Sequence, residues 1–302
     1  HKIFSDQQTR FPELSGEARA RVLASRRVVD EAVRTSRVVY GVTTGFGALK
    51  DKFIPADDTR TLQLNLLRSH CAGVGPAVPR EVVRAMLLLR AHSLAMGASG
   101  VRPELIDMLA AMLERRVTPV VPLQGSVGAS GDLAPLAHMA SVLVGEGEAW
   151  LAEQRMPAGL ALRGAGLQPL VLEAKEGLAL VNGTQFSTAW AALACAEAER
   201  VWEAAMGAAA LSTEVLLGSF QPAREDVQAL RPYRGAQEAA RRLREYSRGS
   251  ALVASHKDCG RLQDAYSLRC VPTVMGASWD AILHVEQQLE VELNSVNDNP
   301  LV

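Results

Sequence analysis

The sequence predicts a mainly α protein built around a bundle of long helices. Apolar residues recur at helical spacing through most of the 302 residues, and only 5% of the residues are aromatic. This pattern favours an aliphatic core between helices. Short strands are expected only around 117–122 and 167–172, too few for a large sheet. Pro119 and Pro169 would confine both of them to sheet edges.

The first clear helices are expected between residues 79 and 113. Pro79 suits a first helical position, because its fixed φ fits the helix and its missing N–H has no partner there. The apolar stripe that follows is formed by Val82, Val83, Met86, Leu87 and Leu89. Pro103 and Glu104 open another helix. Its apolar side is formed by Leu105, Leu109, Met112 and Leu113.

Two long helices are expected later in the chain. The alanine-rich stretch from about Thr188 to Leu217 has no internal proline, and a last helix runs through Ile282 to Val296. Gly-rich segments at 40–47, 97–100, 124–132 and 182–185 are expected to be loops. We place a domain boundary near residue 180, which gives an N-terminal region, 1–180, and the first part of a helical bundle, 181–302.

Composition excludes several classes of function. The 32 basic and 33 acidic residues are balanced, so neither nucleic acid nor a membrane surface is an expected partner. No apolar run is long enough to span a membrane, and the first twenty residues do not form a secretory signal. Four scattered cysteines favour reduced thiols and a cytoplasmic location. No metal site is expected, because His92, His138, His256 and His284 lack ligand spacing.

The segment Gly125–Leu136 is the most informative part of the chain, because it contains Ala129-Ser130-Gly131. Such a tripeptide cyclises when the amide nitrogen of Gly131 attacks the carbonyl carbon of Ala129. Glycine permits the tight turn that this attack requires. Loss of the Ser130 hydroxyl as water then creates an exocyclic methylidene. The product is 4-methylideneimidazol-5-one (MIO), a strong electrophile.

A bare Ala-Ser-Gly tripeptide is weak evidence, and a second copy lies upstream at Ala98-Ser99-Gly100. The alternatives for either copy are a flexible loop, a helix cap or a phosphate cradle at a helix N-terminus. No Gly-Lys-Ser/Thr follows Ser130, and Asp132 stands where a Gly-x-Ser-x-Gly elbow needs glycine. The sequence around each copy must therefore separate them.

Five sequence blocks match one known family, in the family's order. The segment Ser126–His138 resembles the signature of histidine and phenylalanine ammonia-lyases. The other blocks are Tyr40–Gly47, Leu178–Gln185, Gln263–Cys270 and Asp298–Val302. From roughly residue 10 to its last residue, the chain resembles the aromatic amino acid ammonia-lyases and aminomutases. The upstream tripeptide matches a structural segment of that family, Ser99–Arg102, and is rejected as the cofactor.

The resemblance implies a fold, a cofactor and the residues around it. The fold would be a fumarase/aspartase-like bundle of long helices, with a small mixed N-terminal region that carries the loop. Ala129, Ser130 and Gly131 would form MIO autocatalytically. Gly128 and Asp132 resemble the residues that compress the loop for cyclisation. Leu133 would help to line the pocket.

The resemblance also implies catalytic and substrate-binding residues. Tyr40 matches the tyrosine that, as tyrosinate, removes the β-proton of the substrate. Arg269 matches the arginine that binds the substrate carboxylate, for which a planar guanidinium is well suited. Gln263 and Tyr266 resemble residues that hydrogen-bond the prosthetic ring and the substrate. Asn182 matches an asparagine that contacts the ring or the carboxylate.

Substrate choice is assigned to Ser69-His70, which resembles the Ser-His pair of histidine-specific members. A histidine can hydrogen-bond an imidazole directly. The expected reaction is the elimination of ammonia from L-histidine to give urocanate. Ala265 stands where many histidine-specific members have proline, and it also suits tyrosine lyases and aminomutases. The alternatives are therefore a tyrosine or phenylalanine ammonia-lyase, a 2,3-aminomutase, or a non-catalytic helical scaffold with an open loop.

The resemblance further implies how the protein assembles. Members of the family form homotetramers whose active sites combine residues of neighbouring subunits, so Tyr40, Ser130 and Arg269 need not share a chain. Members also continue well past Val302, which implies that the chain is truncated relative to the family. The expected partners are a small amino-acid substrate, further copies of the chain, and a C-terminal piece of the same protein.

Overall fold

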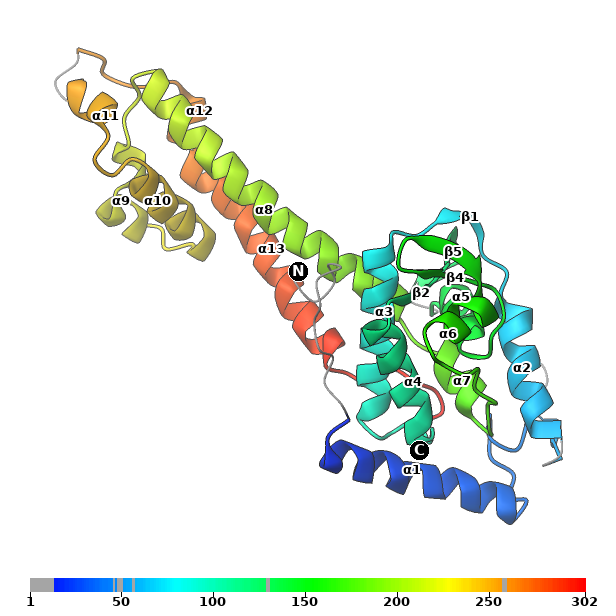
Figure 1. Ribbon diagram of the computed structural model, residues 1–302. Coiled ribbons are helices and arrows are strands. Elements are labelled where there is room, and N and C mark those ends of the chain that lie inside the picture. Colours follow the sequence, from blue (N-terminus) through cyan, green and yellow to red (C-terminus); the bar gives the residue numbers. More distant parts are fainter. Residues whose placement is uncertain (1–13, 46, 48–50, 56–57, 129–130, 257–259) are drawn as a thin grey trace. The chain divides into compact units, whose positions relative to one another are not determined.

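The computed structural model describes residues 14–45, 47, 51–55, 58–128, 131–256 and 260–302 (Figure 1). Contacts between residues divide the chain into two compact units. Unit 1 comprises His1–Ala191 and Glu292–Val302, and unit 2 comprises Ala192–Val291. The chain thus leaves unit 1, forms unit 2 and returns. The expectation of a mainly α fold is confirmed.

Helices form most of unit 1. They are α1 (Gly16–Arg34), α2 (Thr59–His70), α3 (Arg80–Ala95), α4 (Pro103–Glu114), α5 (Leu133–Leu143), α6 (Ala158–Gly164), α7 (Glu176–Val181) and the start of α8 (Gln185–Val215). Pro103 is the first residue of α4, as predicted. Pro79 is the N-cap of α3 rather than its first residue, because its ψ of 137° is still extended. The stripes predicted on α3 and α4 are buried at Met86, Leu87 and Leu109.

Among the described residues of unit 1, five short strands form two small antiparallel sheets. In one, β1 (Val74–Ala77) pairs with β3 (Pro122–Gln124). The other has the order β2-β4-β5, with β2 (Val117–Pro119), β4 (Glu148–Leu151) and β5 (Gln154–Pro157). The strand predicted near residue 117 is thus confirmed, and Pro119 lies on an edge strand as expected.

The strand expected at 167–172 does not form. That segment is irregular, and its Leu170 amide donates a single backbone hydrogen bond to the Leu143 carbonyl. The Pro169 ring packs against Gly145. The apolar residues of this segment therefore cover α5 without pairing with a strand.

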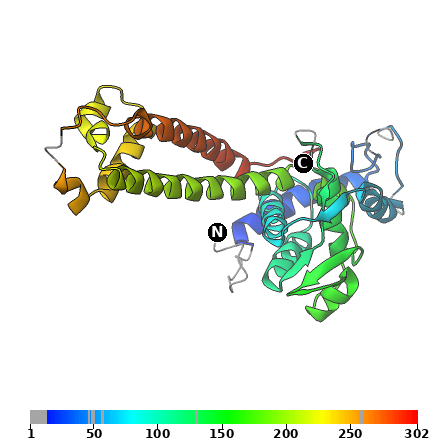
Figure 2. The ribbon, with the colours of Figure 1, turned by 90° about the horizontal axis from the view of Figure 1, so that it is seen from above.

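Among its described residues, unit 2 consists of helices and the turns and loops that connect them. It contains most of α8 and of α13 (Val271–Leu293), which run side by side (Figures 1 and 2). Between them lie the 3₁₀ helix η4 (Gln221–Ala223), α9 (Glu225–Ala229), α10 (Arg234–Tyr246), α11 (Ala251–Ser255) and α12 (Tyr266–Arg269). The predicted long helices are thus confirmed, although α13 ends three residues before Val296.

The core of unit 2 forms where α8, α10 and α13 meet. The Trp202 and Trp279 rings lie 4.4 Å apart, and the Trp202 indole N–H donates to the Met275 carbonyl at 2.8 Å. Gly235 on α10 and Gly276 on α13 touch so closely that a Cβ on Gly276 would lie 2.4 Å from the Ala236 nitrogen. These glycines therefore set the spacing between the two helices.

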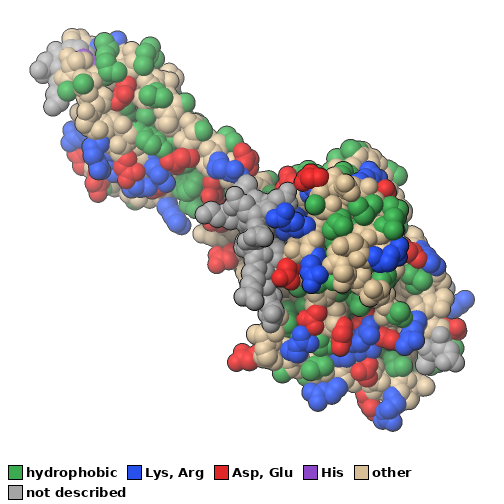
Figure 3. All heavy atoms as spheres, viewed as in Figure 1, with side chains coloured by type: hydrophobic (Ala, Val, Ile, Leu, Met, Phe, Trp, Pro, Cys, Tyr) green, Lys and Arg blue, Asp and Glu red, His purple; other side chains and the backbone are tan. Residues whose placement is uncertain are grey.

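Acidic and basic side chains are interspersed on the face shown in Figure 3. On α10, for example, Arg241 forms ion pairs with Glu238 and Glu245. Among the described residues, no helix has the length and apolar character that crossing a bilayer requires.

Candidate active site

The loop before α5 turns back on itself tightly. The Gly131 amide donates to the Gly128 carbonyl at 2.9 Å, and the Val127 amide donates to the Gly131 carbonyl at 3.3 Å. Gly131 has a φ of +109°, which only glycine adopts without strain. Ala129 and Ser130 lie outside the described residues. The described residues on either side of them are joined by these two backbone hydrogen bonds.

Asp132 fixes this loop through hydrogen bonds. Its side chain is fully buried and accepts three hydrogen bonds: from Ser126 Oγ at 2.6 Å, Ser187 Oγ at 2.9 Å and the Ser187 amide at 2.8 Å. The Asp132 amide donates to the Gly183 carbonyl at 2.8 Å. One carboxylate thus connects the loop to the first turn of α8. Leu133 follows as the first residue of α5.

The turn from Asn182 to Gln185 lies beside the loop. Gly183 leaves no room for a side chain, because a Cβ there would lie 2.5 Å from Arg90 Nη1. That nitrogen donates to Gln185 Oε1 at 2.9 Å. Complete burial lowers the pKa of Arg90 to about 10, although the charge of Asp298 opposes the shift. Asn182 Nδ2 donates to the Asn299 carbonyl at 3.0 Å.

Tyr40 lies in a turn near this segment and is 41% exposed. The next residue, Gly41, packs so closely that a Cβ there would lie 3.2 Å from Pro300 Cδ and 2.6 Å from Leu178. Pro300 directly follows Asn299, the residue that binds Asn182. The Tyr40 turn and the Asn182 turn therefore contact the same short segment.

Ser69 and His70 end helix α2. Ser69 Oγ donates to the Leu66 carbonyl at 2.9 Å, and His70 Nδ1 lies 2.9 Å from the same oxygen. A neutral His70 with its proton on Nδ1 can therefore donate to this carbonyl. The lone pair of Nε2 then becomes the acceptor that the ring can offer to a ligand.

The segment after His70 reaches the loop. The Gly73 amide donates to His138 Nε2 at 3.0 Å, and a Cβ on Gly125 would lie 3.3 Å from Gly73 Cα. Burial lowers the pKa of His138, which keeps its Nε2 available as an acceptor. Unit 1 thus gathers three segments around the 125–132 loop: the end of α2, the start of α8 and the Asn182 turn.

The other three predicted residues belong to unit 2. The Arg269 guanidinium lies 5.2 Å from the centre of the Tyr266 ring, and its Nε donates to the Asp264 carbonyl at 3.1 Å. Gln263 and Arg269 line a cavity of about 740 Å³, which is also lined by three further arginines, Arg224, Arg244 and Arg261. Arg224 and Arg261 form ion pairs with Asp226 and Asp264, so Arg244 and Arg269 are the arginines of this cavity best placed to bind an anionic group such as a carboxylate.

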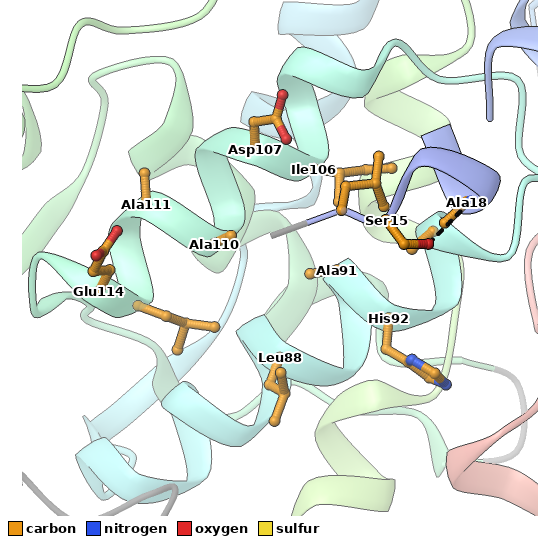
Figure 4. Close-up of a pocket in the computed structure, with 13 residues that line it drawn as sticks. Ser15, Ala18, Leu88, Ala91, His92, Ile106, Asp107, Ala110, Ala111 and Glu114 are labelled. Carbon is orange, nitrogen blue, oxygen red and sulfur yellow. Dashed lines mark hydrogen bonds between the residues drawn. The ribbon is translucent and has the colours of Figure 1, made fainter. Parts of the chain in front are cut away.

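A separate cavity of about 400 Å³ lies between α1, α3 and α4 (Figure 4). Its lining is largely apolar, with Leu88, Ala91, Ile106 and Ala110 among the residues that form it. No predicted site residue lines it. It therefore differs from the candidate active site in both place and chemistry.

Several residues of the site could not be singled out from sequence. Ser126 and His138 lie within the signature block, but the block alone does not show which of its members bind Asp132 or Gly73. Ser187 and Arg90 come from helical segments whose amphipathic pattern predicts packing only. Arg90 is expected outside the apolar stripe of its helix, so its complete burial is a result that the sequence did not predict.

These features identify a family. The profile described as aromatic amino acid lyase matches residues 4–302, and the chain belongs to that family. It is 52% identical over 292 residues to the histidine ammonia-lyase of Sorangium cellulosum (strain So ce56), and 48% identical over 288 residues to that of Bacillus subtilis (strain 168). These alignments cover 96% and 95% of this chain. They cover 57% and 56% of the two relatives, so the chain spans a little over half of their length.

Solved structures give the same assignment. The histidine ammonia-lyase of Trypanosoma cruzi has a TM-score of 0.88 and 38% identity, over 99% of this chain and 56% of that protein. The phenylalanine aminomutase of Pantoea agglomerans also has a TM-score of 0.88, with 32% identity over 95% of this chain and 59% of that protein. Lyases and aminomutases of the family thus share this fold.

Proposed function

We propose that the protein containing this chain is a histidine ammonia-lyase, which converts L-histidine into urocanate and ammonia. The observation that carries the proposal is the tight 128–131 turn fixed by the buried Asp132 carboxylate. Relatives named histidine ammonia-lyase, at about half identity over nearly the whole chain, support the choice of substrate.

The cofactor we propose is MIO, formed from Ala129, Ser130 and Gly131. The described residues fit it: Gly131 has the backbone conformation of a tight turn, and Asp132 holds the loop on a rigid helix start. Its methylidene carbon would supply an electrophile for the substrate amine. The loop thus needs no metal or added cofactor to provide this chemistry.

We assign the remaining roles to the chain's own residues. Tyr40, partly exposed beside the Pro300 segment, removes the β-proton of the substrate. Arg269 binds the substrate carboxylate from the arginine-lined cavity of unit 2. Asn182 orients the ring or the carboxylate through its amide. Gln263 and Tyr266 complete the polar surroundings.

Assembly into a homotetramer would bring residues of unit 1 and unit 2 from neighbouring subunits into one pocket. Large apolar side chains of unit 2 support an interface between copies. Val201, Leu211 and Val285, on α8 and α13, are 61%, 64% and 46% exposed. Aliphatic residues on long helices are suited to packing against further helices.

We propose that selectivity for histidine comes from the pair at the end of α2. With Nδ1 of His70 directed at the Leu66 carbonyl, Nε2 can accept a hydrogen bond from an imidazole N–H. A phenyl ring has no such donor, and a phenol carries its O–H outside the ring, at a different position from an imidazole N–H. His70 is only partly buried in the single chain, so strong rejection of such an analogue requires that assembly of the subunits bury it further.

The test uses two serine variants of the full-length protein. Ser130→Ala should keep its helical content, retain the mass of the uncyclised chain and release no ammonia from L-histidine, whereas the wild type should lack two waters. The matched control is Ser99→Ala in the upstream copy. Ser99 is buried and its Oγ has no hydrogen-bond partner, so the variant should cyclise and turn over normally. Full activity of Ser130→Ala would refute the proposal.

The rival is an aminomutase or an aromatic ammonia-lyase, which Ala265 and the similarity to phenylalanine aminomutase favour. Histidine, tyrosine and phenylalanine should be assayed side by side, with unsaturated and β-amino acid products scored separately. Urocanate as the only major product would support the lyase. Any β-amino acid formed at a comparable rate would favour the mutase.

A further inference from the structure

A buried ion pair lies in unit 1, behind the candidate active site. Lys175 Nζ and Asp298 Oδ2 are 2.7 Å apart, and both side chains are 0% exposed. The two residues are 123 positions apart in the sequence. Lys175 also has a φ of +73°, a left-handed conformation that is strained for a residue other than glycine.

Stability alone gives little reason for this arrangement. Two charges lose their hydration when they are buried, and an apolar pair of similar volume is often equally stable or more so. The strained backbone of Lys175 adds a further cost. A buried ion pair that is present despite these costs indicates that it fixes the positions of the residues it contacts.

The neighbours form a continuous series of contacts that ends at Asn182. Asp298 Oδ2 binds Lys175, while its Oδ1 accepts the Asn299 amide at 2.7 Å. The carbonyl of the same Asn299 accepts Asn182 Nδ2 at 3.0 Å. Lys175 is the N-cap of α7 and Asn182 is its C-cap. The 298–299 peptide therefore joins both ends of one short, buried helix.

This arrangement restricts the Asn182 side chain. One of its two N–H donors is committed to Asn299, so the amide plane is fixed and the remaining groups are presented in one orientation. Arg90 adds a second positive charge that attracts Asp298 and also binds Gln185 beyond the Asn182 turn. A neutral residue at 298 would lose both attractions, and the 298–299 peptide would lose the ion pair that fixes its position relative to α7.

We propose that Lys175 and Asp298 are positioning residues for ammonia elimination, which act by fixing the Asn299 carbonyl that orients the Asn182 amide. The proposal rests on the proposed function of the site. It assigns a role to two residues that do not themselves contact the substrate.

The test is a double-mutant cycle in the full-length protein. Asp298→Asn should still lose two waters on maturation but should lower kcat/KM for L-histidine by about 10- to 100-fold, as loss of an outer-shell partner does. In an Asn182→Ala background, Asp298→Asn should lower kcat/KM by less than about twofold, because the Asn182 amide that it would misplace is already absent. The matched control, Glu148→Gln, removes one partner of the exposed Arg155–Glu148 pair and should leave kcat/KM unchanged.

A lone Asp298→Asn change leaves Lys175 as an uncompensated buried charge and so endangers folding. The variant Lys175→Met/Asp298→Asn removes both charges and should show the same loss and the same dependence on Asn182. Any of three results would overturn the positioning role: equal losses with and without Asn182, full activity of either variant, or failure of both variants to fold. An active wild type then leaves the proposed function intact. A wild type that releases no ammonia from any of the three amino acids would overturn the function itself.

Discussion

The Asp132 carboxylate is the best place to test how the loop is held. Its three hydrogen bonds join the loop to α8, and its side chain is fully buried. Hydrogen bonds to a charged group contribute about 1.5–3 kcal/mol each. After Asp132→Ala, the Ser126 and Ser187 hydroxyls can rotate toward other acceptors, but the Ser187 amide cannot. We therefore expect a loss of about 4–6 kcal/mol, less than the full sum.

Two milder variants give a graded series. Ser126→Ala removes one donor and should cost about 1–2 kcal/mol. Asp132→Asn keeps one oxygen but turns the other into a donor that faces either an amide or a hydroxyl, which should cost about 2–3 kcal/mol. A domain is stable by about 5–15 kcal/mol, so the alanine variant is expected to be close to unfolding.

The assay combines two measurements on the same samples. Urea-induced unfolding followed by circular dichroism gives the free energy of unfolding, and intact mass gives the fraction that has lost two waters. Both should fall in the order Ser126→Ala, Asp132→Asn, Asp132→Ala. If Asp132→Ala were as stable as the wild type within about 0.5 kcal/mol and fully dehydrated, the anchoring role would be wrong.

Two further predictions concern pH and packing. Burial holds the pKa of His138 below its ordinary 6.5, so on acidification the unfolded chain takes up the proton first. The stability from this group is complete above that pH and is lost as the pH falls below it. His138→Gln keeps an acceptor for the Gly73 amide, and its Tm should therefore drop less than that of the wild type between about pH 7.5 and about pH 5; an equal drop would contradict the assignment. Gly276→Ala places a Cβ 2.4 Å from a backbone nitrogen of α10, and should lower the free energy of unfolding by about 1–3 kcal/mol. Gly207→Ala on α8 places a Cβ that meets nothing within 4 Å and serves as its control, since it should be neutral or stabilising.

Much of the helical framework could be predicted from sequence, because its signals are local. The α3 stripe repeats every three to four residues, and the alanine-rich stretch of α8 has no proline to end it. The strands were harder to predict from sequence. All four residues of β1 are exposed, so they show no alternation, and β4 and β5 pair through a short hairpin that composition does not reveal.

The segment at 167–172 shows the limit of the local signal. Its apolar residues resemble a strand, but no partner strand lies next to it, and α5 provides the surface that it covers. The same limit applies to the candidate site. The family blocks predict Tyr40, Asn182 and Asp132 as site residues, but the Lys175–Asp298 ion pair depends on a contact between residues far apart in the chain. No window of sequence shows which lysine will be buried.

The order of the chain has a consequence for how the protein is made. Lys175 leaves the ribosome 123 residues before Asp298, the one carboxylate that forms an ion pair with it in the described part of the chain. At about 5–20 residues per second, this interval lasts about 6–25 s. During that time all of unit 2 is translated. Until Asn299 has been synthesised, the Asn182 side chain lacks the carbonyl that accepts its hydrogen bond. Nascent unit 1 therefore depends on a segment that is synthesised after a whole separate unit.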